Sequence, residues 1–169
     1  MRFTEVKACH ATLVVTLSLL AGAWAQDPGK KEIGQVRTEL IFGTSGSLAA
    51  LGRVTPLGDT EQSQLRKVAK LAKFKTFVTL GSVKQSILAG YKSWASPIKN
   101  SEAIMVTFQP QARVVDKKLR LDIEYWQKKK MALRWDRVFE VGKSVYLIGP
   151  EWRDGNLIIK VELVDLKDK

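Results

Sequence analysis

The sequence has one cysteine and one histidine, Cys9 and His10, and both lie in the first 25 residues. From residue 26 onward the chain therefore contains no thiol and no imidazole. These absences exclude disulfide bonds, a thiolate zinc site, a Ser-His-Asp triad and a cysteine nucleophile from that part of the protein. Carboxylates, lysines, serines and tyrosines remain as the groups that could do chemistry there.

Long apolar runs are also missing. The run at 11–21 is well short of the roughly 20 residues that a membrane-spanning helix needs. It follows two basic residues and precedes the tripeptide at 23–25, whose small residues suit a signal-peptidase site. We predict that residues 1–25 are a secretory signal peptide and that the mature chain starts at Gln26. The mature protein is then expected to be periplasmic or extracellular, with no transmembrane segment.

Sequence motifs for cofactors are absent as well. The glycine-containing stretch at 43–46 lacks the Gly-Lys-Ser/Thr ending of a phosphate-binding loop. The acidic residues near the C-terminus, at 165 and 168, do not have the alternate spacing of a calcium loop. We therefore expect no cofactor and no metal, and the sequence assigns no catalytic residue.

Positive charge is abundant. The chain carries 28 Lys and Arg against 17 Asp and Glu, a formal net charge of +11, and the leader contributes little to it. Such a balance favours anionic partners, such as phosphate-bearing glycans, nucleic acid or lipid headgroups, although it also serves solubility.

The pattern after the leader predicts one domain of the α+β class. Residues 26–34 are polar, contain Pro and Gly, and are typical of a flexible leader. The alternation at 35–42 predicts an N-terminal strand, and 43–58 has the composition of a loop. The single domain is then expected to occupy 35–169.

One amphipathic helix is predicted at 59–74. Asp59 and Gln62 have the spacing of a capping box. Apolar residues recur with helical spacing, so they should form one buried stripe. These are Leu65, Val68, Ala69 and Ala72.

The remainder of the sequence has the period of two that is typical of strands. Their short and even spacing predicts a mostly antiparallel meander of about seven strands, which forms a curled sheet or small sandwich with the helix on one face. The expected strands are 75–80, 82–88, 103–108, 118–126, 132–140, 144–148 and 156–164.

The hairpin formed by 118–126 and 132–140 has a predictable register. If Lys129 is the centre of its turn, apolar residues of the two strands face each other, and Asp122 faces Asp136. Two carboxylates at that separation resemble the pair of a retaining glycosidase. Arg120 and Arg134 lie on the same face, however, which favours a charge ladder on a solvated sheet.

A basic aromatic surface is the candidate binding site. In a meander, alternate turns lie at the same end of the sheet. The turn formed by the three consecutive lysines at 128–130 and the 150–155 loop should therefore lie together. Cations beside tryptophans can bind anionic sugars or single-stranded nucleic acid, while tryptophans at sheet ends also seal cores. The predicted binding residues are Trp126, Lys128, Lys129, Lys130, Trp152 and Arg153.

Two classes of function follow from these observations. We favour an exported, envelope-associated binding or accessory protein that contacts an anionic polymer or a partner protein through this surface. The alternative is a carboxylate-dependent enzyme that acts on glycans. Specific nucleic-acid binding is not expected, because the positive charge does not form one continuous stripe.

Overall fold

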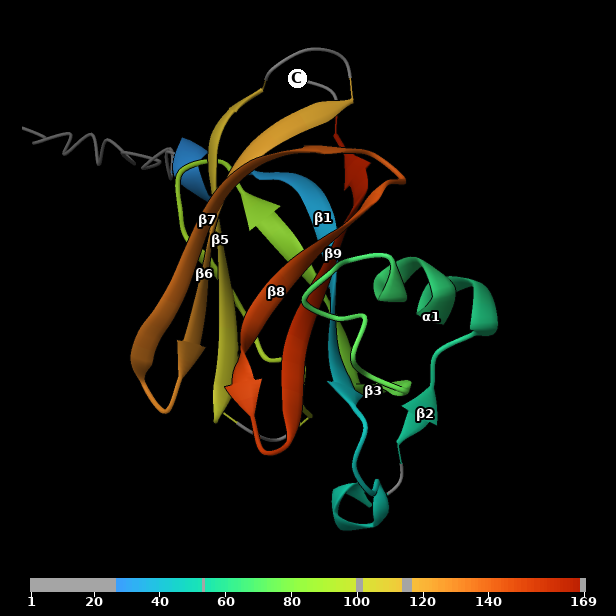
Figure 1. Ribbon diagram of the computed structural model, residues 1–169. Helices are drawn as coiled ribbons and strands as arrows, with labels where there is room; N and C mark the ends of the chain where they lie inside the picture. Colours follow the sequence, from blue (N-terminus) through green and yellow to red (C-terminus); the bar gives the residue numbers. More distant parts are fainter. Residues whose placement is uncertain (1–26, 53, 100–101, 114–116, 168–169) are drawn as a thin grey trace, which may run out of the picture.

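The computed structural model describes residues 27–52, 54–99, 102–113 and 117–167 (Figure 1). The predicted signal peptide lies outside these residues. The described chain forms two antiparallel sheets. One has five strands in the order β2-β3-β1-β9-β8, and the other has four in the order β4-β5-β6-β7. An α+β domain dominated by antiparallel strands is therefore confirmed in this coarse form.

Within the described residues, two strands precede the α-helix and seven strands follow it. Two short 3-10 helices, Pro28–Lys30 and Ala49–Leu51, flank the first strand. The others are β1 (Glu32–Thr44), β2 (Thr55–Pro56), α1 (Asp59–Arg66), β3 (Thr76–Leu88), β4 (Ser93–Ala95), β5 (Ile104–Arg113), β6 (Lys118–Gln127), β7 (Lys130–Glu140), β8 (Ser144–Trp152) and β9 (Gly155–Leu166).

The main hydrophobic core lies between the two sheets. Alternate residues of each strand turn inward, as the period of two requires. Leu40 and Phe42 of β1 contribute from the five-stranded sheet, and Phe108 of β5 and Ile123 of β6 contribute from the four-stranded sheet. All four side chains are almost fully buried. The domain is thus a small sandwich.

The predicted continuous meander is only partly right. β5, β6 and β7 do form a meander, but the chain then crosses to the other sheet through the turn around Gly142. β8 pairs with β9, and β9 pairs with β1 rather than with β7. Even spacing of strands along a sequence does not reveal such a crossing, because both topologies have the same local pattern.

β3 is one long strand and not two strands divided at Gly81. The register against β1 shifts between Leu40 and Ile41, which places an irregularity beside this glycine. A Cβ atom at Gly81 would lie 2.1 Å from the carbonyl oxygen of Pro97. The glycine therefore permits a close approach of two chain segments, as glycines within strands often do.

The leader predicted at 26–34 is part of the fold from Asp27 onward. The Asp27 carboxylate accepts hydrogen bonds from the Gly29 amide and from the Tyr91 hydroxyl. The first strand then begins at Glu32, three residues before its predicted start. These contacts attach the beginning of the described chain to the segment that precedes β4.

The helix is shorter than predicted. α1 ends at Arg66, and the chain continues through turns to residue 73. Gly58 occupies the N-cap without a side-chain cap, and Gln62 donates to the Leu57 carbonyl oxygen instead. Because helical geometry stops at Arg66, the predicted buried stripe fails beyond Leu65: Val68 is 40% exposed. Ala69 and Ala72 are also exposed, while Leu71 and Phe74 are buried.

α1 covers the outer face of the five-stranded sheet. A second apolar cluster, which includes Leu65, Leu71 and Phe77, lies beneath it. Glu61 accepts hydrogen bonds from Tyr146 at 2.5 Å and from Lys160 at 2.7 Å, so the helix is also held by polar contacts. The outer face of the five-stranded sheet is therefore covered by α1, whereas none of the described helices covers the outer face of the four-stranded sheet. None of the described helices is long and apolar enough to cross a membrane.

Candidate functional site

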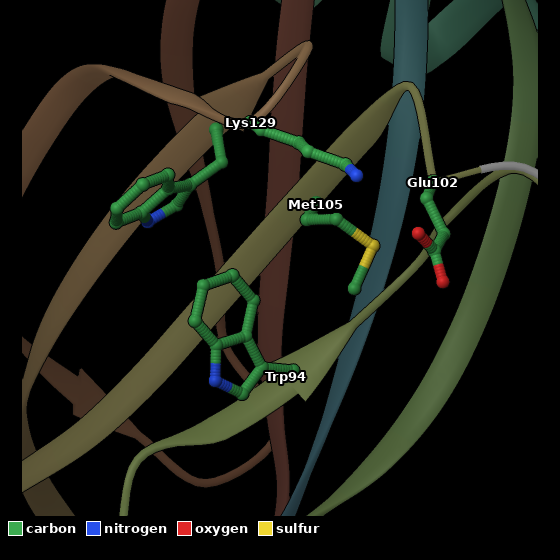
Figure 2. Close-up of a pocket in the computed structure, with 5 residues that line it drawn as sticks. Trp94, Glu102, Met105 and Lys129 are labelled. Atoms are coloured by element: carbon green, nitrogen blue, oxygen red, sulfur yellow. The ribbon is translucent and has the colours of Figure 1, made fainter.

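A pocket on the outer face of the four-stranded sheet is the candidate site. Its walls are the side chains of Trp94, Glu102, Met105, Trp126 and Lys129, and its volume is about 270 Å³. Trp94 belongs to β4, Met105 to β5 and Trp126 to β6, while Lys129 comes from the turn before β7. Figure 2 shows these side chains gathered over β5.

The strand register brings the two tryptophans together. Trp126 lies opposite Met105, and Trp94 lies opposite Thr107, which is two residues further along the same strand. Both indoles therefore project from the same face and meet across β5. Their ring centroids are 5.5 Å apart with 51° between the planes, and Trp94 is 46% exposed. The rings form an open apolar surface and not a closed stack.

Glu124 holds Trp126 in this position. Its carboxylate accepts a hydrogen bond of 2.9 Å from the Trp126 indole, two of 2.8 Å from Lys92 and one of 3.1 Å from Thr107. Burial would raise the pKa of Glu124, but the hydrogen bonds from Lys92 and Trp126 outweigh it and hold that pKa below its usual value. Glu124 is therefore a charged group that fixes an aromatic wall of the pocket.

The predicted register of β6 and β7 is confirmed from Lys118 to Tyr125, and Asp122 does face Asp136. Each of these carboxylates is bound by an arginine. Arg134 donates to Asp122 at 2.8 and 2.6 Å, and Arg120 donates to Asp136 at 2.8 and 2.5 Å. The hydrogen bonds from Arg120 also lower the pKa of Asp136. This arrangement is a charge ladder in which each carboxylate is bound by a guanidinium group.

The turn between β6 and β7 differs from the prediction. A bulge between Tyr125 and Trp126 shifts the register, so Gln127 pairs with Lys130 and the turn contains only Lys128 and Lys129. Both have positive φ angles, 48° and 64°. Because the bulge shifts the pairing by one residue, Lys130 pairs with Gln127 and is the first residue of β7, and it is not part of the turn.

The predicted basic aromatic surface is divided between the two sheets. Both hairpin turns lie toward the same end of the sandwich in Figure 1. Trp126 and Lys129 line the pocket, whereas Trp152 packs edge-on against Phe42 with ring centroids 5.1 Å apart. Arg153 lies over the Trp152 ring at 4.4 Å. Trp152 thus helps to seal the core, and Arg153 covers it.

Three residues of the pocket were not predicted from the sequence, namely Trp94, Glu102 and Met105. Trp94 lies in a segment with a Gly90 and a Pro97, which obscure a strand of only three residues. In the structure its ring is exposed between two buried small residues, an alternation over three residues that is too short to be recognised in the sequence. Within the described residues, no group of three or more acidic, cysteine or histidine side chains is placed to hold a metal ion.

No protein-family model matches this chain, and the comparisons with curated proteins and with solved structures found no match either. The functional argument therefore depends on the geometry of the pocket.

Proposed function

We propose that this protein is an exported binding protein whose Trp94–Trp126 pocket holds a sugar ring of an anionic polysaccharide. The observation that supports this most directly is a pair of indoles, that of Trp94 exposed and that of Trp126 half-buried, beside a lysine in a pocket of about 270 Å³. Exposed apolar patches with a polar rim are typical of binding sites. A sugar ring offers an apolar face of C–H groups for the indoles and hydroxyl groups for the rim.

The polar groups of the rim suit this ligand. Lys129 supplies a cation, and the Glu102 carboxylate can accept hydrogen bonds from hydroxyl groups. A nucleic-acid strand would need a continuous positive track for its phosphates. Here the neighbouring cations of the sheet face are already paired with Glu124, Asp122 and Asp136, so such a track is not formed.

A glycan-cleaving enzyme has less support. Retaining and inverting glycosidases need one carboxylic acid that stays protonated and one carboxylate that is free to react. Asp122 and Asp136 are both bound to guanidinium groups on the open sheet face. Binding without catalysis is therefore the function that this geometry favours.

Binding should depend on the indoles. We expect Trp94→Ala to weaken retention by polygalacturonate in affinity gel electrophoresis about tenfold, because an apolar contact surface is lost. Trp94→Ala/Trp126→Ala should abolish retention. Val138→Ala, an exposed site on the same sheet, is the matched control and should bind like the wild type.

The single variant is expected to fold, because the Trp94 side chain is already half exposed in the wild type. The far-ultraviolet circular dichroism spectrum of each variant should match that of the wild type. Undiminished retention of the folded double variant would refute the proposed site. Retention that requires a protein from an envelope extract, and not the polymer, would favour a partner protein instead.

Export is also a proposal, and it predicts a defined N-terminus. The intact mass of the protein recovered from the secreted or periplasmic fraction should correspond to a chain that begins at Gln26. Recovery of a full-length, membrane-bound form would contradict both cleavage and the location.

A further inference from the structure

We propose that Lys129 is the residue that selects an acidic sugar, and that a strained two-residue turn holds it over the pocket. This inference rests on the proposed sugar-binding function. It goes further by assigning the recognition of one anionic group to one lysine, and not to the three consecutive lysines together.

The first observation is the backbone conformation of the turn. Lys128 and Lys129 have φ angles of 48° and 64°, a left-handed conformation that is unfavourable for residues with a Cβ atom. Two-residue hairpin turns of this kind strongly prefer Asn-Gly. A sequence of two lysines gives up stability at this turn, and retained strain of this sort is often found at functional sites.

The second observation is how the turn is placed. The bulge between Tyr125 and Trp126 shortens the hairpin loop to two residues. The Lys128 amide then donates a 3.0 Å hydrogen bond to the carbonyl oxygen of Ala103, just before β5. The turn is thereby attached to the segment that carries Glu102. Figure 2 shows the Lys129 side chain reaching over Met105 toward that side of the pocket.

The third observation is charge. Lys92, Arg120 and Arg134 on this sheet face are each paired with a carboxylate. Lys129 forms no ion pair within the part of the chain that the structure describes, and it lines the pocket. It is therefore the cation of the pocket that remains available to a ligand.

These observations indicate the ligand class. A ring that lies on Trp94 and Trp126 and carries a carboxylate at its edge would bring that group to Lys129. Its hydroxyl groups would meet Glu102, which lies on the side of the pocket toward which Lys129 reaches (Figure 2). A pyranose with an acidic substituent, such as a uronic acid unit, has this combination of an apolar face, hydroxyl groups and one negative charge.

The test compares the same sugar with and without its charge. Binding of oligogalacturonates and of their fully methyl-esterified forms should be measured by calorimetry at low salt. The wild type should prefer the acid by about tenfold, since a hydrogen bond to a charged group is lost in the ester. Added salt should reduce this preference, because the lysine is exposed.

Three variants separate charge from strain. Lys129→Gln should bind acid and ester equally. Lys128→Asn/Lys129→Gly, the preferred turn sequence, should also lose the preference while its Tm rises by about 3 °C. Lys84→Gln, which removes one exposed charge from the other sheet, should retain the preference and the wild-type Tm.

The outcomes distinguish the two proposals. If the wild type binds acid and ester equally but needs Trp94, the sugar site stands and the role of Lys129 is refuted. A preference for acid that survives in Lys129→Gln refutes it too. If neither ligand binds, or if binding does not require the indoles, the proposed function itself fails. An unchanged or lower Tm in the Asn-Gly variant would show that the turn stores no strain.

Discussion

Replacing Phe42 with Ala should lower the free energy of unfolding by about 3–5 kcal/mol, as large-to-small changes of buried aromatic residues do. Phe42 lies at the centre of the core between the sheets and is almost fully buried. Its ring also supports Trp152 through an edge-on contact. The loss should appear in urea unfolding as a lower midpoint with an unchanged slope.

Val138→Ala provides the contrast for this experiment. Val138 is 46% exposed on β7, so its replacement should change the free energy of unfolding by no more than about 0.5 kcal/mol. The Phe42 variant should in addition change the fluorescence of Trp152. A cost for Phe42→Ala as small as that for Val138→Ala would contradict the sandwich core described above.

Replacing Glu124 with Ala should affect both stability and binding. Lys92 would lose its carboxylate, and Thr107 and the Trp126 indole would lose their acceptor. We expect a cost of about 2–3 kcal/mol, since buried polar groups would be left unpaired and Lys92 remains partly solvated. The proposed sugar binding should weaken as well, because Trp126 would no longer be fixed.

The pH dependence of stability tests the same carboxylate. Because hydrogen bonds hold the pKa of Glu124 below its usual value, its contribution is present above about pH 4.3, the usual value in an unfolded chain. It is lost as the pH falls through the lower pKa of the folded state. As the pH is lowered, the Tm of Glu124→Gln should therefore fall less steeply than the Tm of the wild type. An identical fall in both proteins would mean that another carboxylate is responsible.

The parts of the fold that follow from local pattern could be predicted. The alternation of β6 and β7 fixed which face of each strand is apolar, so the pairing of Asp122 with Asp136 followed from the sequence. The same reasoning failed at Trp126, where the bulge adds a residue. A bulge of this kind leaves no mark in the alternation until the strands have been aligned.

Other parts depend on contacts between distant segments. The apolar spacing beyond Arg66 looked helical, yet Leu71 and Phe74 are buried from turns that dock on the sheet. The candidate site likewise depends on β4, which consists of only Trp94 and its two neighbours, all three paired with β5. A single short edge strand has too little sequence pattern to be recognised before its partner is known.

The position of β1 has a consequence for how the protein is made. This first strand lies at the centre of its sheet, between β3 and β9, and β9 is the last strand of the chain. The five-stranded sheet thus cannot close until the ribosome has released nearly the whole polypeptide. Topologies dominated by such distant pairings fold slowly. The central strand therefore lacks one of its two partner strands for most of the time that the chain is being synthesised, and it pairs on both sides only at the end.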